Sequence, residues 1–478
     1  MSIMSSARDP RKVYIIGVGM SAFEKPGRRK DFGYAEHTLE AATRALIDAG
    51  INYDEVETAT VGYTAADSTA GQRCLYQLGL TQIPIINVIN ACSTGSTALF
   101  FARQAVATGA VECALALGFE QMKSGSLVGN YNDRTSSLGF AMPILNELQP
   151  MTNAPRNPQI FAAASTEYIN NHPQFNNNHH LDMIAQKNHA HSTLNPYSQF
   201  KDLYTLEQVH DARTIYGPLT LLHCSPTSDG AGCVIVASED FVKKHHLEPQ
   251  AIEIMAQVMA TDSIRSFAVA GSPKSAIGIA GGDMTKKAAS EAYKLAKITP
   301  KDVDVCELHD CFSSNELITY DALGLCEPGH AGEWLASGAP YHPSFAPAGA
   351  KPARRTPVNL SGGLISKGHP LGATGLAQCT ELTWQLRGWA GKRQVENVKI
   401  ALQHNVGLGG AVVVGVYRKA FPNASTAGWT DPRVRHGFNP AVEHRPITMA
   451  EVNTVKSKGG SLLDAAKGFG AANVPANL

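Results

Sequence analysis

The sequence has no excess of charge and no long apolar run. Its 41 Lys and Arg residues balance 41 Asp and Glu residues, so the formal net charge is zero. A nucleic-acid-binding surface needs a basic excess, so no nucleic-acid partner is expected. No stretch approaches the roughly 18 apolar residues of a membrane-spanning helix, so no transmembrane segment is expected.

The cysteines form no recognisable framework. They are nine in number, irregularly spaced and without a C-x-x-C pair: Cys74, Cys92, Cys113, Cys224, Cys233, Cys306, Cys311, Cys326 and Cys379. An odd count without paired spacing argues against structural disulfides and zinc, and favours a reducing compartment. A group of histidines has no cysteine or carboxylate at fixed spacing beside it, so we interpret it as surface histidines and expect no metal site. This group is His172, His179, His180, His189 and His191.

One cysteine lies between a predicted strand and a predicted helix. An apolar run at residues 83–89 leads into Asn90-Ala91-Cys92-Ser93-Thr94-Gly95, and a helical pattern at residues 97–107 follows. Backbone N–H groups and the positive dipole end of a helix start stabilise a thiolate. Cys92 is therefore a candidate nucleophile, and the alternative is a buried structural cysteine.

Strand and helix patterns alternate along most of the chain, which predicts an α/β fold with a mainly parallel sheet. The alternation stops in a segment rich in Asn, Pro, His and Ser, which we interpret as an inserted loop or lid domain. The predicted units are an N-terminal half at residues 1–122 completed by 219–245, the loop domain at 123–218, a C-terminal half at 246–420 and a polar tail at 421–478.

The two halves carry a short internal repeat. Cys92-Ser93-Thr94-Gly95 and Gly372-Ala373-Thr374-Gly375 each begin a predicted helix that leads to an apolar strand. Two such units indicate a duplicated fold, although four matching positions also arise by chance. If a pseudo-twofold axis relates the halves, the helix starts meet, and Cys92 lies near His369.

Three further motifs follow predicted strands in the second half. They are His309-Asp310-Cys311-Phe312, Gly368-His369-Pro370 and the glycine-rich turn at residues 407–410. A buried core histidine, a packed cysteine and a tight turn are the alternatives for each one alone. Ligands gather at the carboxyl ends of strands in such folds, so together the motifs favour one site.

Together these motifs resemble the thiolase superfamily, and specifically the sterol-carrier-protein type of 3-oxoacyl-CoA thiolase, from about Val13 to Lys419. Most thiolases carry Asn-Glu-Ala-Phe where His309–Phe312 stands, and Cys-x-Gly where Asn405-Val406-Gly407 stands. The second cysteine is thus at Cys311, which marks this subtype. The resemblance implies two pseudo-repeated βαβ halves in a five-layered αβαβα arrangement with an inserted loop domain.

The resemblance also implies a two-step acyl transfer. Cys92 attacks the 3-keto carbon of a 3-oxoacyl-CoA, and His369 takes the proton of the thiol. Cys311 protonates the departing enolate of acetyl-CoA or propionyl-CoA and then deprotonates CoA. His309 and His369 donate to the thioester oxygen, and the N–H groups of Cys92 and Gly407 form a second oxyanion hole.

Coenzyme A is expected as a substrate, with no bound cofactor. The family contacts the CoA pantetheine with a serine that Ser225 matches by position, and a plain turn serine is the alternative. The family also implies a homodimer, paired through the sheet edges beside the nucleophile helix. The final Ala476-Asn477-Leu478 resembles a peroxisomal address, with the mitochondrion and cytosol as alternatives.

Other functions are possible on this fold. A β-ketoacyl synthase lacks the His309–Phe312 motif with its cysteine, and the related aldolases lose the nucleophile. A non-catalytic lipid- or CoA-binding scaffold and a biosynthetic acetoacetyl-CoA condensation are further alternatives. Residues 421–478 are too few for the lipid-transfer domain that the sterol-carrier family often appends.

Overall fold

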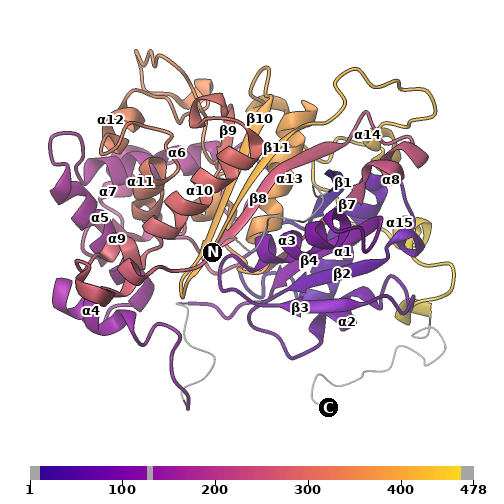
Figure 1. Cartoon of the computed structure of the whole chain (residues 1–478), viewed down its shortest axis with the longest axis horizontal. Coiled ribbons are helices and arrows are strands. Elements are labelled where there is room, and N and C mark those ends of the chain that lie inside the picture. The colour runs from indigo at the N-terminus through magenta and orange to yellow at the C-terminus, as the bar shows by residue number, and fades with distance from the viewer. Residues whose placement is uncertain (1–10, 126–132, 465–478) are drawn as a thin grey trace.

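A computed structural model describes residues 11–125 and 133–464. Within these residues, nine strands form one sheet in the order β3-β2-β4-β7-β1-β8-β11-β10-β9 (Figure 1). The strands are β1 (Val13–Met20), β2 (Thr58–Gly62), β3 (Ile85–Val88), β4 (Cys113–Glu120), β7 (Gly230–Ser238), β8 (Ile252–Ala260), β9 (Val305–Glu307), β10 (Ile400–Gly407) and β11 (Ala411–Lys419), and β5 (Thr214–Tyr216) pairs separately with β6 (Leu219–Thr220).

Helices cover both faces of the sheet and build the segment inserted after β4. They are α1 (Tyr34–Ala49), α2 (Ala70–Leu75), α3 (Thr94–Ala107), α4 (Ala141–Leu148), α5 (Arg156–Asn171), α6 (His179–Ser192), α7 (Leu206–His210), α8 (Glu239–Lys244), α9 (Ala276–Ile279), α10 (Gly282–Ala296), α11 (Ser313–Ala322), α12 (Ala331–Ala336), α13 (Thr374–Arg387), α14 (Pro432–His436) and α15 (Met449–Val455). None of the helices in the described residues is long and apolar enough to cross a membrane.

The sheet is mixed, so the prediction of a mainly parallel sheet is wrong. Among the strands of residues 11–125 and 133–464, only the pairs β2–β3, β2–β4 and β9–β10 are parallel. Two connections account for three of the five antiparallel pairs in this sheet. The strand β11 follows β10 through a tight turn, with Gly409 and Gly410 at positive φ, and such a hairpin forces antiparallel pairing. The strand β7 returns from the inserted segment and runs antiparallel between β4 and β1.

The sheet divides into two halves at the contact of β1 with β8. Only two residue pairs join these strands, Tyr14 with Glu253 and Ile15 with Ile252. On one side lie β3, β2, β4, β7 and β1, and on the other β8, β11, β10 and β9. This arrangement agrees with two halves, each carrying a helix that follows the repeated tetrad, α3 in the first and α13 in the second.

Alternating side chains along the strands sort the helices into layers. On β4, Leu115 and Leu117 pack with α1 and α2, whereas Ala114 and Ala116 face the opposite way and pack with α3 and α13. Each face of the first half-sheet therefore carries its own helical layer (Figure 1).

The second half-sheet repeats this pattern. On β10, Ala401 packs in the same core as α3 and α13, and Leu402 packs with α10 and α11 on the other face. The order from one side to the other is thus helices α1 and α2, the first half-sheet, helices α3 and α13, the second half-sheet, and helices α10 and α11. The predicted five-layered αβαβα arrangement is confirmed.

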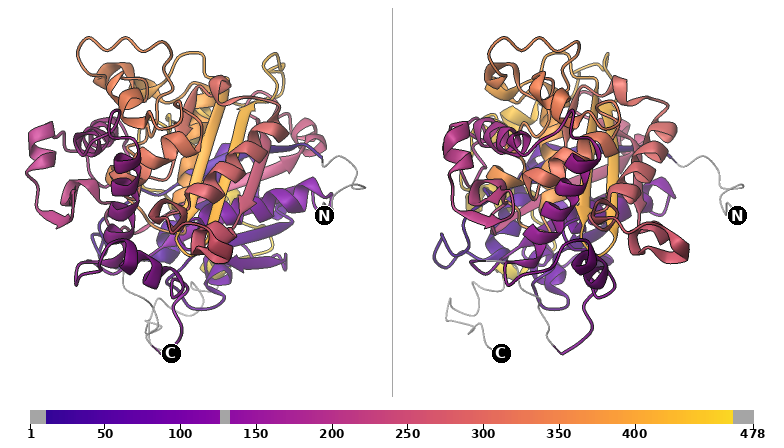
Figure 2. Two further views of the ribbon diagram at one scale, coloured as in Figure 1. Left: turned by 60° about the vertical axis from the view of Figure 1, so that its left-hand side comes forward. Right: turned by 90° about the vertical axis from the view of Figure 1, so that its left-hand side faces the viewer.

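The inserted segment contains helices α4 to α7. Its apolar side chains share one core with those of the C-terminal half, for example Phe161 of α5 with Phe312, whose ring centroids are 5.2 Å apart. Figure 2 shows these helices against the C-terminal half in both views. The loop domain is therefore anchored directly to the His309–Phe312 motif.

The predicted polar tail packs on the N-terminal half as far as the structure describes it. Val452 and Val455 of α15 are buried in the core with α1. The Arg435 side chain donates to the backbone carbonyl of Ile47 (2.9 Å), and Nε2 of His444 lies 2.5 Å from a carboxylate oxygen of Glu40. Residues 421–464 thus form part of the folded body.

Candidate active site

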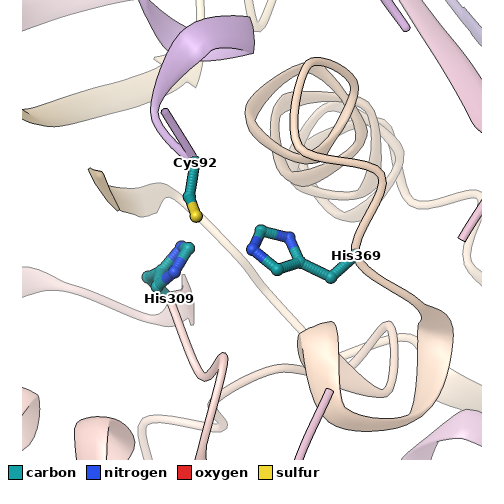
Figure 3. Close-up of side chains that lie close together, drawn as sticks. All are labelled: Cys92, His309 and His369. Carbon is teal, nitrogen blue, oxygen red and sulfur yellow. The ribbon is translucent and has the colours of Figure 1, made fainter. Parts of the chain in front are cut away.

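Three side chains from distant parts of the chain meet in one place. Cys92 precedes α3, His309 follows β9 and His369 precedes α13. One ligand atom of each, the Cys92 sulfur and a ring nitrogen of each histidine, lie within 4.8 Å of one another (Figure 3). The two imidazole centroids are 5.1 Å apart with their planes nearly perpendicular. The structure therefore brings together the predicted nucleophile and both predicted imidazoles.

A constrained turn presents Cys92. The preceding Ala91 has φ +46°, which a residue with a Cβ rarely adopts. The Ser93 hydroxyl donates to the Asn90 carbonyl (2.8 Å), and the Thr94 hydroxyl donates to the Ala91 carbonyl (2.6 Å). These short polar side chains hold the turn closed, so the Cys92 sulfur points toward the two rings (Figure 3).

The two repeated tetrads do meet, because their glycines allow contact between backbones. A Cβ on Gly95 would lie 2.5 Å from the Gly372 carbonyl oxygen. A Cβ on Gly375 would lie 2.1 Å from the Ser96 hydroxyl. Only glycine permits this approach, which brings the starts of α3 and α13 together and places the Cys92 turn beside the His369 turn.

The hydrogen bonds of His369 define which ring nitrogen faces the cysteine. Its Nδ1 lies 2.8 Å from the Thr374 hydroxyl, which itself donates to the Pro370 carbonyl (3.0 Å). A hydroxyl has one proton, so Thr374 must accept from Nδ1–H of His369. The lone pair is then on Nε2, which is buried and has no hydrogen-bond partner among the described residues. This nitrogen is free to accept a proton from Cys92.

His309 is held by contacts with the neighbouring strand β10. It is buried, its backbone N–H donates to Nδ1 of His404 (3.4 Å), and its own Nδ1 lies 3.0 Å from the Asn405 amide nitrogen. The motif position that most thiolases fill with a cysteine, residue 405, therefore contacts an imidazole of the site. No motif in the sequence indicated a role for Asn405 itself.

Asp310 connects the two histidine loops and was also missed. Its carboxylate accepts the backbone N–H groups of Leu364 (2.7 Å) and Ile365 (3.3 Å) in the π-helical turn Gly363–Lys367, just before His369. It also accepts from the Asn188 amide of α6 (2.7 Å). The only signal in the sequence was the position of a carboxylate between His309 and Cys311.

Cys311 and Ser225 lie next to each other. Cys311 is buried, and its backbone carbonyl accepts the N–H of Ser225 (2.9 Å). Burial raises the pKa of the Cys311 thiol well above its usual range, and the neighbouring Cys92 thiol raises this pKa further. Gly407 lies against the nucleophile turn, because a Cβ there would be 2.4 Å from the Asn90 carbonyl oxygen. His309, His369, Cys311 and Gly407 thus lie close to Cys92 or its turn, whereas Ser225 is placed only beside Cys311.

The resting site is neutral. Burial, and then the Glu120 carboxylate, raise the pKa of Cys92 to about 12, and burial with Lys367 lowers the pKa of His369 to about 3. The predicted stabilisation of a thiolate by the helix start is therefore outweighed. A thiol whose pKa lies above neutral keeps its proton, so a base must remove it during the reaction.

This neutral pair predicts how Cys92 reacts with iodoacetamide. The thiolate fraction rises with pH below the raised pKa, so alkylation of Cys92 should become about tenfold faster per pH unit between about pH 7 and pH 10. Mass spectrometry of the peptide that contains Cys92 measures the rate. A rate that is already constant near neutral pH would indicate a preformed ion pair and contradict this prediction.

The three site residues are also close enough to hold a metal ion. In the part of the chain that the structure describes, they are the one group of at least three His, Cys, Asp or Glu residues with this property. The interpretation of the histidines between residues 172 and 191 as surface side chains is wrong for His180, His189 and His191, which are buried. Among the described residues this set forms no group of the same kind.

Comparisons with known proteins identify the family. The family described as "Thiolase, N-terminal domain" matches residues 13–240, and "Thiolase C-terminal domain-like" matches residues 279–413. The chain is 52% identical over 419 residues to sterol carrier protein 2 of Gallus gallus, covering 87% of this chain and 74% of that protein.

Two solved structures share the fold. The Ltp2-ChsH2(DUF35) aldolase superposes with a TM-score of 0.68 at 21% identity, over 85% of this chain and 98% of that one. Human mitochondrial 3-ketoacyl-CoA thiolase in complex with CoA superposes with a TM-score of 0.63 at 20% identity, over 87% and 100%. Since both halves match thiolase domains and half of the aligned residues are shared with sterol carrier protein 2, the chain belongs to the thiolase superfamily and is a thiolase-family acyltransferase.

Proposed function

We propose that this protein is a 3-oxoacyl-CoA thiolase of the sterol-carrier-protein type. It uses CoA to cleave 3-oxoacyl-CoA into a shortened acyl-CoA and acetyl-CoA, or propionyl-CoA where the substrate is 2-methyl-branched. The observation that carries the proposal is the approach of the Cys92 sulfur and the two imidazoles to within 4.8 Å. The same site catalyses Claisen condensation when concentrations favour it.

The first step forms an acyl-enzyme. The Cys92 sulfur attacks the 3-keto carbon while Nε2 of His369 takes the thiol proton. The oxyanion that develops on the keto oxygen accepts from the backbone N–H groups of Cys92 and Gly407. The bond between carbons 2 and 3 then breaks, the acyl group stays on Cys92, and the electron pair leaves on the enolate of acetyl-CoA.

The second step regenerates the enzyme. Cys311 gives its proton to the enolate carbon, while His309 donates to the enolate oxygen. The Cys311 thiolate then takes the proton of the incoming CoA thiol, and the CoA sulfur attacks the acyl carbon. Cys92 leaves as a thiolate and recovers its proton from His369, so both cysteines return to the thiol form.

The CoA substrate is proposed to lie along the loop domain with its pantetheine near Ser225. The hydrogen bond from Ser225 N–H to the Cys311 carbonyl supports this, because it places the serine beside the group that handles the CoA proton. We also propose the peroxisome as the compartment, from Ala476-Asn477-Leu478, which lies outside the described residues. The mitochondrion and the cytosol are the alternatives.

Trapping tests the function against a non-catalytic scaffold. The protein mixed with acetoacetyl-CoA should gain the mass of one acetyl group on Cys92. Thiolysis assays with straight, 2-methyl-branched and bile-acid-type 3-oxoacyl-CoA substrates then define which substrate class the enzyme prefers. A folded protein that forms no adduct would favour the scaffold. An aldolase reaction needs no sulfur nucleophile, so the placement of Cys92 between two imidazoles argues against it.

We further propose a homodimer that pairs through β3. This strand is at the edge of the sheet and has exposed apolar side chains beside it: Ile86 is 49% exposed, Ile89 64% and, on α3, Phe101 41%. An uncovered apolar edge strand is a site for pairing with a second copy. Sedimentation should give a dimer at micromolar concentration and a monomer for Ile86→Asp. A monomeric wild-type protein would contradict the proposal.

A further inference from the structure

The two histidines beside Cys92 are held by hydrogen bonds of opposite direction. We propose that a buried chain of hydrogen bonds from Tyr417 through Gln403, Ser96 and Asn405 fixes His309 as an Nε2–H donor, and that Asn405 is a positioning residue for the reaction. The catalytic part of this inference rests on the proposed thiolase function. The direction of the hydrogen bonds rests on the geometry alone.

The donor-to-acceptor direction of this chain of hydrogen bonds is fixed at Gln403. Its Nε2 lies 2.5 Å from the Gly375 backbone carbonyl, which can only accept, so the atom there must be the amide NH2. The amide oxygen then faces the Tyr417 hydroxyl, which donates to it. The same NH2 group lies 3.2 Å from the Ser96 hydroxyl oxygen. Ser96 therefore faces a donor on this side and has its own proton available for another partner.

The proton of the Ser96 hydroxyl then determines which side of the Asn405 amide faces His309. The Ser96 hydroxyl lies 2.9 Å from the Asn405 amide and donates its proton there, so the atom that receives it is the amide oxygen. The Asn405 NH2 group must then face His309, where it lies 3.0 Å from Nδ1. Nδ1 of His309 is thus an acceptor. Burial, followed by His369 and His404, lowers the pKa of His309 well below its usual value, so the neutral ring has its single proton on Nε2.

Burial makes this direction stable. The five side chains of the chain are each at most 1% exposed: Ser96, Gln403, Asn405, Tyr417 and His309. Water therefore cannot hydrogen-bond to a group that has lost its partner through a reversal. Reversing any one member would leave two donors or two acceptors facing each other away from water, and such an unsatisfied buried group is costly. The orientation of the Gln403 amide, which the Gly375 carbonyl fixes, therefore determines the orientation at His309.

The result is a site with one basic and one donating imidazole. Thr374 leaves the lone pair of His369 on Nε2, which suits it to take the Cys92 proton. Asn405 leaves a proton on Nε2 of His309, which suits it to donate to the enolate oxygen. The enolate oxygen thus has a donor in His309 that does not depend on the proton transfer from Cys92 to His369.

Asn405→Asp tests the inference because it keeps the shape and removes the donor. An ionised carboxylate can only accept, so it should force the proton of His309 onto Nδ1 and remove Nε2–H. We expect kcat for acetoacetyl-CoA thiolysis at pH 8 to fall by about 100-fold, comparable with loss of one oxyanion donor, with little change in KM. Activity should partly recover at acidic pH, where the new carboxyl is protonated and can donate to Nδ1.

The tautomer is measured directly. Ring-nitrogen NMR of protein labelled with 15N-histidine distinguishes Nε2–H from Nδ1–H, and the His309 signals are those lost in His309→Asn. We expect Nε2–H in the wild type and Nδ1–H in Asn405→Asp at pH 8. Ser96→Ala leaves Asn405 in place but removes the group that orients it, and should give a mixture of tautomers and a loss in kcat of about tenfold.

The matched control is Asn176→Asp. Asn176 is also buried, and its amide nitrogen donates to the backbone carbonyls of His172 and Gly329 rather than to a ring. This control should lower Tm, keep kcat within about twofold and leave the His309 tautomer unchanged.

An Nδ1–H tautomer in an active wild-type enzyme would overturn the inference, as would an inverted tautomer in Asn405→Asp with undiminished kcat. A wild type that performs no thiolysis but shows Nε2–H would refute the proposed function alone.

Discussion

Cys92→Ala is expected to lower kcat for thiolysis by about 10⁴- to 10⁶-fold, since removing a covalent nucleophile removes the path through the acyl-enzyme. No other sulfur replaces it. Cys311 lies beside Cys92, but in the proposed reaction it transfers protons and forms no bond to the acyl carbon. The variant should therefore show no acyl adduct after mixing with acetoacetyl-CoA, as measured by the mass of the intact protein.

Cys113→Ala is the matched control for this variant. Cys113 is a fully buried cysteine of β4 that packs with α1 and α2, away from the rings. The control removes the same atom and should keep both the adduct and kcat within about twofold. An adduct that persists in Cys92→Ala would place the acyl group on another residue and contradict the proposed mechanism.

The convergence of the site was predictable because the signals were local. The tetrads at Cys92 and Gly372 each begin a helix, and a duplicated fold brings such starts together. The glycines at 95 and 375 explain physically why the starts can touch, since each lies against the other half at distances that exclude a Cβ. The five layers followed from the resemblance to thiolases, and the alternation of side chains along strands such as β4 explains them in the structure.

The direction of the strands and of the hydrogen bonds was not predictable from local patterns. The β7 strand is antiparallel because it returns after an inserted segment, and no residue within β7 specifies the neighbour with which it pairs. Ser96 and Asn405 are 309 residues apart in the sequence, so neither motif shows which way their amide and hydroxyl point. The charge of Cys92 depends on burial and on Glu120 of another strand, which outweigh the helix start that the sequence does show.

The place of the second cysteine follows from the same geometry. Where most thiolases carry a cysteine at position 405, this chain has an amide that contacts Nδ1 of His309. Proton transfer then needs a thiol elsewhere, and Cys311 lies on a loop that Asp310 ties to the His369 turn. With the second cysteine at position 311 and an asparagine at position 405, His309 is held in the tautomer that donates from Nε2, and a thiol remains next to Cys92.

Cys311→Ala is expected to lower kcat by about 10³-fold, the usual range for loss of a general acid and base. It should leave the alkylation of Cys92 by iodoacetamide nearly unchanged, because the nucleophile and His369 remain. Cys224→Ala is the neighbouring control, since the Cys224 thiol lies near Cys311 and donates to the Thr220 carbonyl (3.3 Å). If Cys224→Ala loses activity and Cys311→Ala does not, the thiol that protonates the enolate is Cys224 and the assignment of Cys311 is wrong.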